Sequence, residues 1–370
     1  MTTVENTPAG ATTRTGPPQR AAGSHDEFSP LVEVVVGTAV GARLPASDPS
    51  SWLNLHPELT APEVARVPTG PFDRRVIEET EEDLACLVRL LEGLGVTVHR
   101  PAAVDHGAAF ATPHWRSRGL YSYCPRDLTL VVGSTLIEVP SPMRARYFET
   151  GALRPLFQRY LAAGSAWLAA PKPELRADLY GVDDTGRPVL RNTEPAFEAA
   201  NVLRCGRDLF YQVSGSGNEM GFTWLTHTLA ALGDYRLHPV RDLYPHTHID
   251  STLSLIRPGL LLANPARVTE DNLPAPLRSW DRIWCPPMNE PQPPTGTHPL
   301  SSPWIGMNLL MVDPHLAIVD AAQHELIAAL ERHGVQVAGH TLRHARLLGG
   351  GLHCVTLDTV RTGTATDYFG

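Results

Sequence analysis

Lysine is almost absent from this chain. Lys172 is the only lysine among its 370 residues, so arginine carries nearly all of the positive charge, and we interpret this bias as a property of the source genome. The arginines are scattered without forming a basic stripe, and the formal net charge is −8. A nucleic-acid-binding surface needs clustered positive charge, so nucleic acid is excluded as an expected partner.

Cysteine is scarce as well, and long apolar runs are missing. Five widely separated cysteines, an odd number, do not make a disulfide framework and are typical of the reducing cytoplasm. No apolar run reaches the length of about 18 residues that marks a membrane span, so no membrane partner is expected.

The N-terminal residues 1–28 lack the apolar segment of a secretory signal. Their Thr, Gly, Pro and Ala content cannot fill a hydrophobic core. We therefore predict a disordered leader over residues 1–28 and a single domain over residues 29–370.

Apolar sequence is plentiful, at 42% of the residues, and part of it is organised in hairpins. Each hairpin consists of a strand, turn residues and a second strand. They cover 128–140, with a turn at Gly133–Ser134, 251–265, with a turn at Pro258–Gly259, and 308–320, with a turn at Asp313–Pro314. The run 207–213 is predicted to begin a fourth hairpin. Because the strands are nearly continuous in apolar residues, both of their faces should be covered.

A second unit also recurs, consisting of an amphipathic helix, a glycine and a short strand. It occurs in 85–101, 224–240 and 325–340, where apolar residues return every three or four positions. Gly95 and Gly334 fit the position just after a helix end, where a positive φ costs glycine little. Together the two units predict an α/β fold of ββαβ modules arranged around an axis, with the helices outside. A site in such an array lies at its centre, where residues distant in sequence converge.

Polar residues with catalytic potential lie next to the predicted strands. In chain order they are Asp127, Glu198, His246, His248, Asp250, His353 and Cys354. One interpretation is a zinc site, because His246, His248 and Asp250 alternate along the chain and Cys354 could add a sulfur ligand. No second ligand pair at short spacing supports it.

Nucleophilic catalysis is another interpretation of the same residues. A free cysteine has a pKa of about 8.5, so at neutral pH it needs a neighbouring histidine or a cationic substrate to become a thiolate. His248 could act as the base, with Glu198 orienting its ring. Asp127 and Asp250 would then be spare carboxylates that suit a guanidinium or an amine. The pattern alone favours a simpler interpretation, in which Cys354 is a small buried hydrophobic residue.

Several longer stretches resemble the amidinotransferase family, which includes arginine:glycine amidinotransferase and the inosamine-phosphate amidinotransferases. They are "FEAANVLRCGRDLF", "HIDSTLSLIRPGLLLANPARV", "WIGMNLLMV" and "LGGGLHCVTLDTVR". The resemblance extends from residue 31 to the C-terminus and is closest to the inosamine-phosphate branch. It implies a five-bladed α/β-propeller with pseudo-fivefold symmetry, which agrees with the repeated modules.

The resemblance also implies a reaction. An L-arginine amidinotransferase moves the amidino group through a cysteine intermediate to an amine, releases L-ornithine and needs no cofactor. Cys354 matches the nucleophile, His248 in "HID" matches the general acid and base, and Glu198 matches the residue that orients the histidine. Asp127 in "PRD" and Asp250 match the carboxylates that hold the guanidinium.

Three further residues bear on the substrates through the same resemblance. Arg267, in "NPARV", matches the arginine that pairs with the donor's α-carboxylate. Gly306, in "WIGMN", stands where glycine-using members have serine, and an open pocket mouth there would fit an aminocyclitol phosphate such as scyllo-inosamine 4-phosphate. His246 replaces a small residue of that branch, so an amino acid such as glycine or lysine is an alternative acceptor. Because the family is often dimeric, a homodimer is expected.

Two alternatives of other kinds stay open. In an arginine-deiminase-like hydrolase, water would resolve the intermediate instead of an amine, and a non-catalytic arginine-binding protein would use the same fold.

The family usually has aspartate where this chain has Glu198, so the carboxylate lies one methylene further from the backbone.

The residues around Cys354 give two more expectations. His353 is the nearest histidine in sequence, but adjacent residues of a strand point to opposite faces, so His248 is the expected base. Glycines 349–351 are predicted to let the backbone approach the central cavity closely, where any Cβ would crowd the substrate.

Overall fold

The computed structural model describes residues 20–53, 67–184, 186, 188–289 and 298–370, and in these residues five three-stranded sheets share one topology. In four of these sheets an antiparallel hairpin is followed by a third strand, which runs parallel to the second strand of the hairpin. In the fifth sheet the strand at 31–36 pairs antiparallel with the last strand, at 356–361, and parallel with the strand at 97–99. The predicted α/β class is therefore confirmed, and so is the predicted repeat of hairpin and parallel strand.

The strands of the five sheets have the following bounds. They are β21 (Thr356–Arg361), β1 (Leu31–Val36) and β4 (Thr97–His99); β7 (Thr129–Val132), β8 (Thr135–Glu138) and β9 (Ala166–Ala169); β12 (Val202–Cys205), β13 (Asp208–Gln212) and β14 (Arg236–Val240); β15 (Leu253–Arg257), β16 (Leu260–Ala263) and β17 (Asp281–Trp284); and β18 (Leu310–Asp313), β19 (Leu316–Asp320) and β20 (Gln336–His340).

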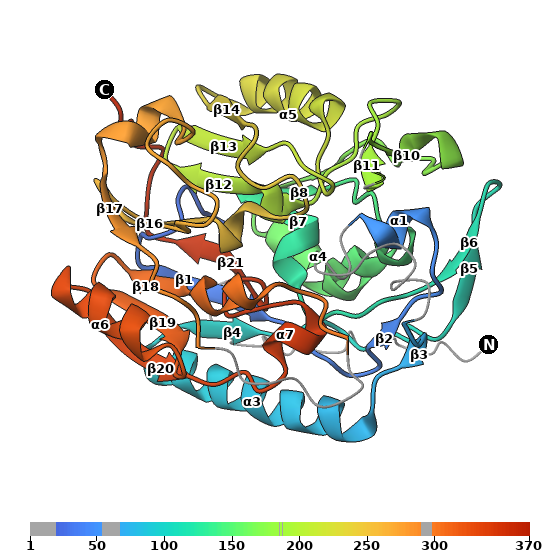
Figure 1. Cartoon of the computed structure of the whole chain (residues 1–370), viewed down its shortest axis with the longest axis horizontal. Coiled ribbons are helices and arrows are strands. Elements are labelled where there is room, and N and C mark those ends of the chain that lie inside the picture. The colour runs from blue at the N-terminus through green and yellow to red at the C-terminus, as the bar shows by residue number, and fades with distance from the viewer. Residues whose placement is uncertain (1–19, 54–66, 185, 187, 290–297) are drawn as a thin grey trace, which may run out of the picture.

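Helices connect the second and third strands of most sheets. They are α3 (Arg74–Gly93), α4 (Arg154–Ala162), α5 (Glu219–Leu232) and α6 (His324–Arg332), while the connection from β16 to β17 carries the 3₁₀ turn η7 (Ala275–Ser279). Figure 1 shows α3, α5 and α6 at the periphery, outside the strands. Gly95 and Gly334 follow the ends of α3 and α6 with φ of +83° and +75°, as their positions in the sequence predicted.

Short elements complete the described part of the chain. They are the helices α1 (Pro49–Trp52) and α7 (Ala345–Leu348), the strand pairs β2 (Arg43–Leu44) with β3 (Gly70–Pro71), β5 (Ala109–Ala111) with β6 (Arg116–Arg118) and β10 (Tyr180–Val182) with β11 (Pro188–Leu190), and the 3₁₀ turns η1 (Pro125–Leu128), η2 (Arg144–Arg146), η3 (Glu149–Leu153), η4 (Ala177–Leu179), η5 (Ala199–Asn201), η6 (Ile249–Ser251) and η8 (Pro303–Met307).

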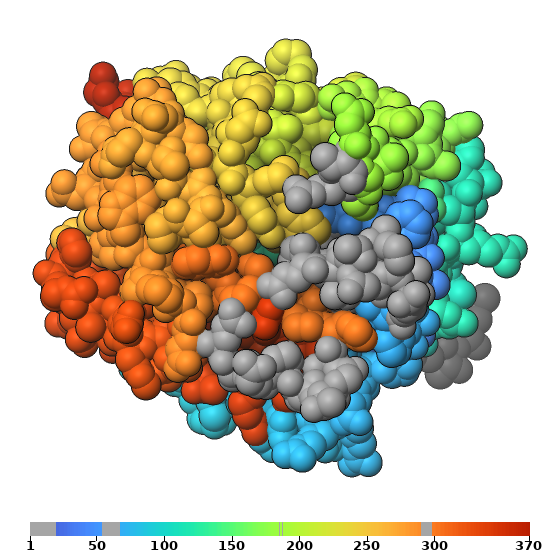
Figure 2. Space-filling model, viewed as in Figure 1, coloured from blue at the N-terminus to red at the C-terminus, as the bar shows by residue number. Residues whose placement is uncertain are grey.

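The modules follow one another around the molecule. In Figure 2 the chain runs around the visible face in order, from light blue at the lower right through green and yellow to orange and red on the left. The last strand, β21, pairs with the first, β1, so the two ends of the repeat share a sheet. Contacts also pass from η1 to η5, from η5 to η6 and from η6 to η8, and β21 contacts η1. The segments that enter the hairpins therefore meet on the inside of the arrangement.

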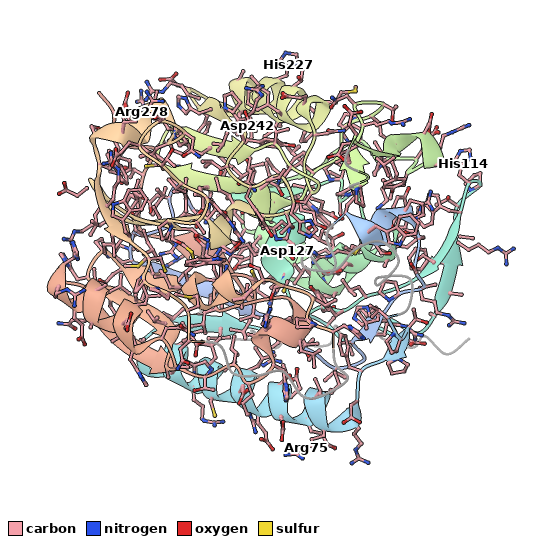
Figure 3. The ribbon with its side chains drawn as sticks, in the orientation of Figure 1. Arg75, His114, Asp127, His227, Asp242 and Arg278 are labelled. Carbon is pink, nitrogen blue, oxygen red and sulfur yellow. The ribbon has the colours of Figure 1, made fainter. Side chains whose placement is uncertain are left out.

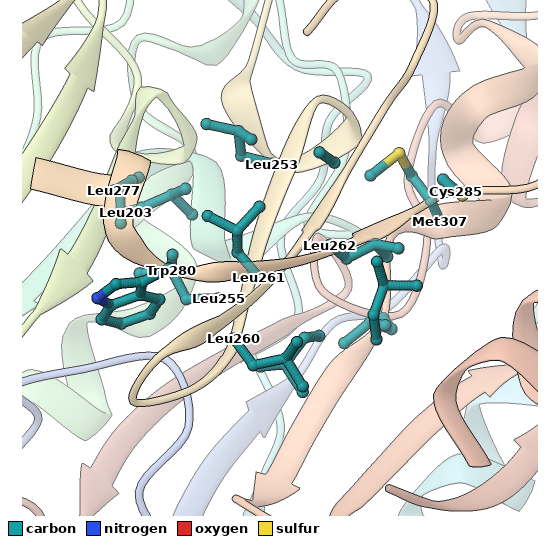
Figure 4. Packing of buried hydrophobic residues seen from close by; sticks show 14 of the residues in the cluster. Leu203, Leu253, Leu255, Leu260, Leu261, Leu262, Leu277, Trp280, Cys285 and Met307 are labelled. Atoms are coloured by element: carbon teal, nitrogen blue, oxygen red, sulfur yellow. The ribbon is translucent and has the colours of Figure 1, made fainter. Parts of the chain in front are cut away.

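The hairpin strands are buried on both faces, as their apolar runs predicted. All residues of β7, β12, β13 and β16 are buried. In the largest apolar cluster, Leu261 and Leu262 of β16 pack among side chains from the neighbouring sheets and from η7 (Figure 4). Full burial of one such leucine contributes about 1.5 to 3 kcal/mol to folding. This packing fixes the hairpins and the turns that lead into them.

Two details of the predicted hairpins are wrong. The turn between β18 and β19 lies at Pro314–His315, one residue later than predicted. The run 207–213 does not begin a hairpin, because β13 pairs antiparallel with the preceding strand β12. The glycine of that turn, Gly206, has a φ of +68°.

The predicted leader is too long at its C-terminal end. Residues 1–19 lie outside the described residues, but residues 22–28 are packed into the fold. Gly23 donates to the Thr359 carbonyl, the Phe28 side chain is buried, and the Glu27 carboxylate pairs with Arg204. Composition alone pointed to disorder because the partners of these polar residues lie more than a hundred positions away. In the described residues, no helix is long and apolar enough to cross a membrane.

Candidate active site

A pocket of about 610 Å³ lies where the turns that enter the sheets meet. Five of the predicted site residues line it: Asp127, Glu198, His248, Asp250 and Cys354. Figure 3 shows Asp127 near the centre of the molecule, whereas Arg75, His114 and His227 lie at its edge. The convergence of residues from distant parts of the chain is therefore confirmed.

Each pocket residue occupies a similar place in its own module. Asp127 lies in η1 before β7, Glu198 is the N-cap residue of η5 before β12, and His248 is the N-cap residue of η6 before β15. Cys354 lies in the turn before β21. A polar group at such a position faces the centre because the buried strand that follows fixes the direction of the turn.

His248 and Glu198 form a close pair. The Nε2 atom of the imidazole lies 2.5 Å from Oε2 of the carboxylate, which also accepts a hydrogen bond from Ser141 Oγ at 2.6 Å. Burial opposes ionisation of Glu198, but the charge of Arg146 and the hydrogen bonds from His248 and Ser141 lower the pKa of Glu198 to about 2. Burial likewise opposes a charged His248, but Asp127 and Glu198 raise the pKa of His248 to about 9.

Arg146 is a component of the site that the sequence analysis did not identify. Its side chain is buried, and one terminal nitrogen lies 2.7 Å from Asp127 Oδ2 and 3.3 Å from Glu198 Oε1. The guanidinium also makes two hydrogen bonds to Glu149, at 2.9 and 2.7 Å. It therefore compensates three buried carboxylates at once. Arg146 lies in the stretch "SPMRARYFE", within the part of the chain that resembles the family, but nothing in its spacing marks it as a pocket residue.

Asp127 retains a free oxygen that faces His248. Its Oδ1 atom is buried without a hydrogen-bond partner in the described residues and lies 3.8 Å from His248 Nδ1. Burial raises the pKa of Asp127, against the charges of His248 and Arg146. Because Arg146 occupies the other oxygen, Oδ1 is the atom available to a cationic ligand.

Cys354 lies in a turn and not in a strand, so the expectation that His353 points away from it is wrong. Both side chains reach the same atom: Asp250 Oδ2 lies 3.4 Å from Cys354 Sγ and 2.9 Å from His353 Nδ1. The side-chain oxygen of Asn308 accepts from the backbone N–H groups of both His353 and Cys354, at 2.9 and 3.1 Å. Asn308 thereby fixes the turn that carries the thiol.

The thiol and its carboxylate neighbour have opposite pKa shifts. The adjacent Cys124 thiol, burial and the charge of Asp250 raise the pKa of Cys354 well above its usual value, so the thiol is neutral at neutral pH. Burial acts against ionisation of Asp250, but the hydrogen bond and charge of His353 and the charge of His248 lower the pKa of Asp250 to about 2. An uncharged thiol therefore faces an ionised carboxylate.

Of the three glycines before this turn, Gly349 lines the pocket, whereas Gly350 and Gly351 pack against protein. Gly349 ends α7 with a φ of +79°. A Cβ on Gly350 would lie 2.4 Å from Cys124 Sγ, and a Cβ on Gly351 would lie 2.7 Å from Asn308 Cβ. Close approach of the backbone to the pocket is thus confirmed at Gly349, whereas the close neighbours of Gly350 and Gly351 are Cys124 and Asn308.

Arg267 lies beside the pocket. Its guanidinium carbon is 3.5 Å from the centroid of the Tyr244 ring, and its terminal nitrogens donate to Ser251 and Ser302. Tyr244, Ser251 and Ser302 all line the pocket. The arginine is therefore close enough to the pocket for the predicted role with a carboxylate.

The other two predicted substrate contacts are not part of the pocket wall in the described residues. A Cβ on Gly306 would lie 2.8 Å from Met288 Sδ and 2.9 Å from Gln323 Cδ, so this glycine permits internal packing and does not widen the mouth. Its neighbour Ile305 lines the pocket instead. His246 lies near Tyr244, with 6.0 Å between ring centroids, outside the lining residues.

The zinc site considered from the sequence is not assembled, because His246 does not lie in the pocket wall with His248, Asp250 and Cys354. A different group comes together: ligand atoms of Asp127, Glu198 and His248 all lie within 4.8 Å of one another. Both carboxylates of that group already pair with the Arg146 guanidinium, which supplies a positive charge there.

The pocket thus combines a thiol, an imidazole paired with a carboxylate, and two carboxylates in an α/β fold of repeated modules. No family model matches the chain. Inosamine-phosphate amidinotransferase 1 of Streptomyces glaucescens is 49% identical over 345 residues, which cover 93% of this chain and 98% of that protein. The L-arginine:L-lysine amidinotransferase of Pseudomonas savastanoi is 35% identical over 361 residues, covering 93% of this chain and 96% of that protein.

Among solved structures, that of inosamine-phosphate amidinotransferase from Streptomyces griseus matches with a TM-score of 0.89 and 48% identity, covering 95% of this chain and all of that chain. The protein described here therefore belongs to the amidinotransferase family. It is an enzyme that transfers amidino groups.

Proposed function

We propose that the enzyme moves the amidino group of L-arginine, through a covalent intermediate on Cys354, to the amine of an aminocyclitol phosphate such as scyllo-inosamine 4-phosphate, and releases L-ornithine. The reaction would belong to the biosynthesis of an antibiotic or another specialised metabolite. The convergence of Cys354, His248 and two buried carboxylates on one pocket is the observation that carries this proposal.

The guanidinium of the donor lies between Asp127 and Asp250. The free Oδ1 of Asp127 accepts from one side, and Asp250 accepts from the side of the thiol. Fixing the cation in this way supplies orientation, which is a large part of the rate acceleration. The positive charge also favours loss of the Cys354 proton to solvent, because it stabilises the thiolate that burial and Asp250 disfavour.

The thiolate attacks the guanidinium carbon and forms a C–S bond. His248 is protonated at neutral pH, because its pKa is about 9, and it donates its proton to the departing δ-nitrogen as the C–N bond breaks. L-Ornithine leaves, and an amidino-thioether remains on Cys354. The neutral His248 then accepts a proton from the incoming amine, which attacks the same carbon, and the thiolate departs with the C–S electrons.

Arg267 pairs with the α-carboxylate of the donor. Its contacts with Ser251 and Ser302 place the guanidinium behind the pocket wall, next to the residue that follows Asp250 in the chain. Burial lowers the pKa of Arg267 from its usual value, and a carboxylate partner would compensate its charge.

The choice of acceptor rests on the relative from Streptomyces glaucescens, whose name specifies an inosamine phosphate. Gly306 gives no support, since it packs against Met288 and Gln323. The Pseudomonas relative acts on L-lysine, as its name states, so lysine is the second acceptor to test.

We also propose that the five sheets are the blades of a closed propeller with pseudo-fivefold symmetry. The pairing of β21 with β1 supports closure, and so do the contacts that lead from η1 through η5 and η6 to η8. In such a closed ring each blade delivers its entering turn to a common axis.

Incubation with L-arginine and a panel of amines tests the function. Sustained release of ornithine should require an acceptor amine, because arginine alone should release no more than one equivalent per enzyme as the adduct forms, and scyllo-inosamine 4-phosphate should give the highest kcat/KM. Rapid quenching with arginine alone should leave an adduct of about 42 Da on the peptide that contains Cys354.

The matched controls are Cys354→Ala, which should form no adduct, and Cys86→Ala, which alters an exposed cysteine outside the pocket and should behave as the wild type. Release of citrulline and ammonia without an amine would support the hydrolase instead. An unmodified Cys354 in a wild-type enzyme that turns over would overturn the covalent mechanism.

A further inference from the structure

We propose that His353 is a positioning residue for the reaction, an inference that rests on the proposed function. Its imidazole stands between two carboxylates, with Nδ1 2.9 Å from Asp250 Oδ2 and Nε2 3.3 Å from Glu27 Oε2. From this place it holds the Asp250 carboxylate in one orientation toward the pocket, so that the guanidinium of the donor binds in line with Cys354.

The far side of the imidazole is anchored in a buried ionic network. Arg204 pairs with both oxygens of Glu27, at 2.9 Å each, and Arg126 lies 3.4 Å from Oε2. Both arginines also bind Asp358, at 2.7 and 2.6 Å. Charge-assisted hydrogen bonds of this kind are about twice as strong as neutral ones, so Glu27 is a rigid support.

The backbone of His353 is fixed as well. Its N–H donates to Asn308 Oδ1 at 2.9 Å, and its carbonyl accepts from Arg126 Nε at 2.8 Å. With a proton on Nδ1 the ring donates to Asp250. The imidazole thus transfers the rigidity of the network to a carboxylate of the pocket.

Without the hydrogen bond from His353, the Asp250 carboxylate could rotate away from the pocket. A second, small cavity adjoins this carboxylate, with room for about one water molecule, and is lined by Asp250 itself together with Glu27, His353 and Ser254. The Oδ2 atom that His353 holds also accepts from Cys354 Sγ at 3.4 Å. Rotation of the carboxylate into the second cavity would therefore remove an acceptor from the guanidinium and from the thiol together.

Three substitutions separate the two contacts of the ring. His353→Asn places an amide near the position of Nδ1 and keeps a donor for Asp250, whereas His353→Gln places one near Nε2 and keeps only the contact with Glu27. His353→Leu keeps neither. We expect His353→Leu and His353→Gln to raise the KM for arginine and to slow adduct formation on Cys354, each by about tenfold, the loss expected for one charge-assisted hydrogen bond.

His353→Asn should restore both quantities to within about threefold of the wild type, and the KM for the acceptor should change little in all three variants. If His353 had a purely structural role, the loss of activity in each variant would follow its loss of stability. The melting temperature of each variant is therefore measured alongside. His238→Leu is the matched control, because it removes another His–carboxylate contact, 2.6 Å from Nε2 to Asp208 Oδ1, outside the pocket.

The two proposals fail in different ways. A wild-type enzyme that forms no adduct with arginine would refute the proposed function. A wild-type enzyme that forms the adduct, with His353→Leu equal to it or with His353→Asn as impaired as His353→Gln, would refute the positioning role alone.

Discussion

The imidazole of His248 lies 2.5 Å from the carboxylate of Glu198, although the family usually has the shorter aspartate at that position. Glu198 is the N-cap residue of η5, and its longer side chain reaches the ring while also accepting from Ser141. The additional methylene therefore does not separate the pair. Glu198 is also fully buried, so its contacts with His248, Ser141 and Arg146 stabilise its negative charge in place of water.

Glu198→Gln should keep the side-chain shape and remove the charge that stabilises the imidazolium. We expect kcat to fall by about tenfold to a hundredfold, because the lost stabilisation of a charged partner is about 1.5 to 3 kcal/mol. Steady-state ornithine release measures it. Asp208→Asn changes the carboxylate that pairs with His238 outside the pocket and should leave kcat unaltered. A Glu198→Gln enzyme with the wild-type rate would exclude Glu198 as the orienting residue.

The pH dependence of stability should reveal the charged His248. Asp127, Glu198 and Asp250 face this ring and raise its pKa from 6.5 to about 9 in the folded state, against the effect of burial. The stabilisation is therefore complete below pH 6.5 and is lost as the pH rises through about 9. Between these values the wild type should lose about 2 to 3 kcal/mol more unfolding free energy than His248→Gln.

Urea unfolding at several pH values from 6 to 10 measures this difference. Groups that titrate in both proteins, such as Cys354, cancel in the comparison. Parallel curves for the two proteins would show that the imidazole is neutral in the folded enzyme.

Arg146→Met should destabilise the protein strongly. The substitution leaves the buried carboxylates of Asp127, Glu149 and Glu198 without their shared cation, and breaking a buried ion pair costs about 3 to 5 kcal/mol. Chemical unfolding at neutral pH measures the loss. Arg74→Met removes an exposed ion pair with Glu78 and should have no measurable effect. A stable Arg146→Met protein would mean that the carboxylates are protonated without the guanidinium.

Gly350→Ala should disturb the nucleophile through Cys124. The new Cβ would lie 2.4 Å from Cys124 Sγ and 3.2 Å from Cys354 Cβ. We expect a loss of about 1 to 3 kcal/mol in unfolding free energy, which is typical of an overpacked core, together with slower adduct formation. The double variant Gly350→Ala/Cys124→Ala should recover part of the stability, because it removes the atom of closest contact. A double variant no better than Gly350→Ala would place the strain elsewhere.

The repeated modules could be predicted because they depend on local patterns. Apolar runs interrupted by Gly133 or by Pro258–Gly259 specify hairpins, and Gly95 and Gly334 mark helix ends through their positive φ. Each of these signals lies within about 15 residues of sequence. Gly306 and His246, the two acceptor contacts predicted from the resemblance, lie outside the pocket wall, because what a residue faces depends on tertiary packing, which no local pattern contains.

Arg146 and Asn308 show the same limit in the pocket. Arg146 contacts Asp127 and Glu198, which lie 19 and 52 positions away in the chain. Asn308 holds the turn of Cys354 from 46 positions away. Their roles exist only after the modules have been brought together.

The sequence by itself determined the types of strand, helix and turn, and through its family motifs the residues of the pocket: Cys354, His248, Glu198, Asp127 and Asp250. Tertiary structure alone decided their partners and charge states. Burial together with Arg146 sets which carboxylates are ionised. The turn before β21 brings the side chains of His353 and Cys354 into contact with the same oxygen of Asp250. The physical reason is that backbone preferences act between neighbours in the chain, whereas desolvation and Coulomb interactions depend on distance in space.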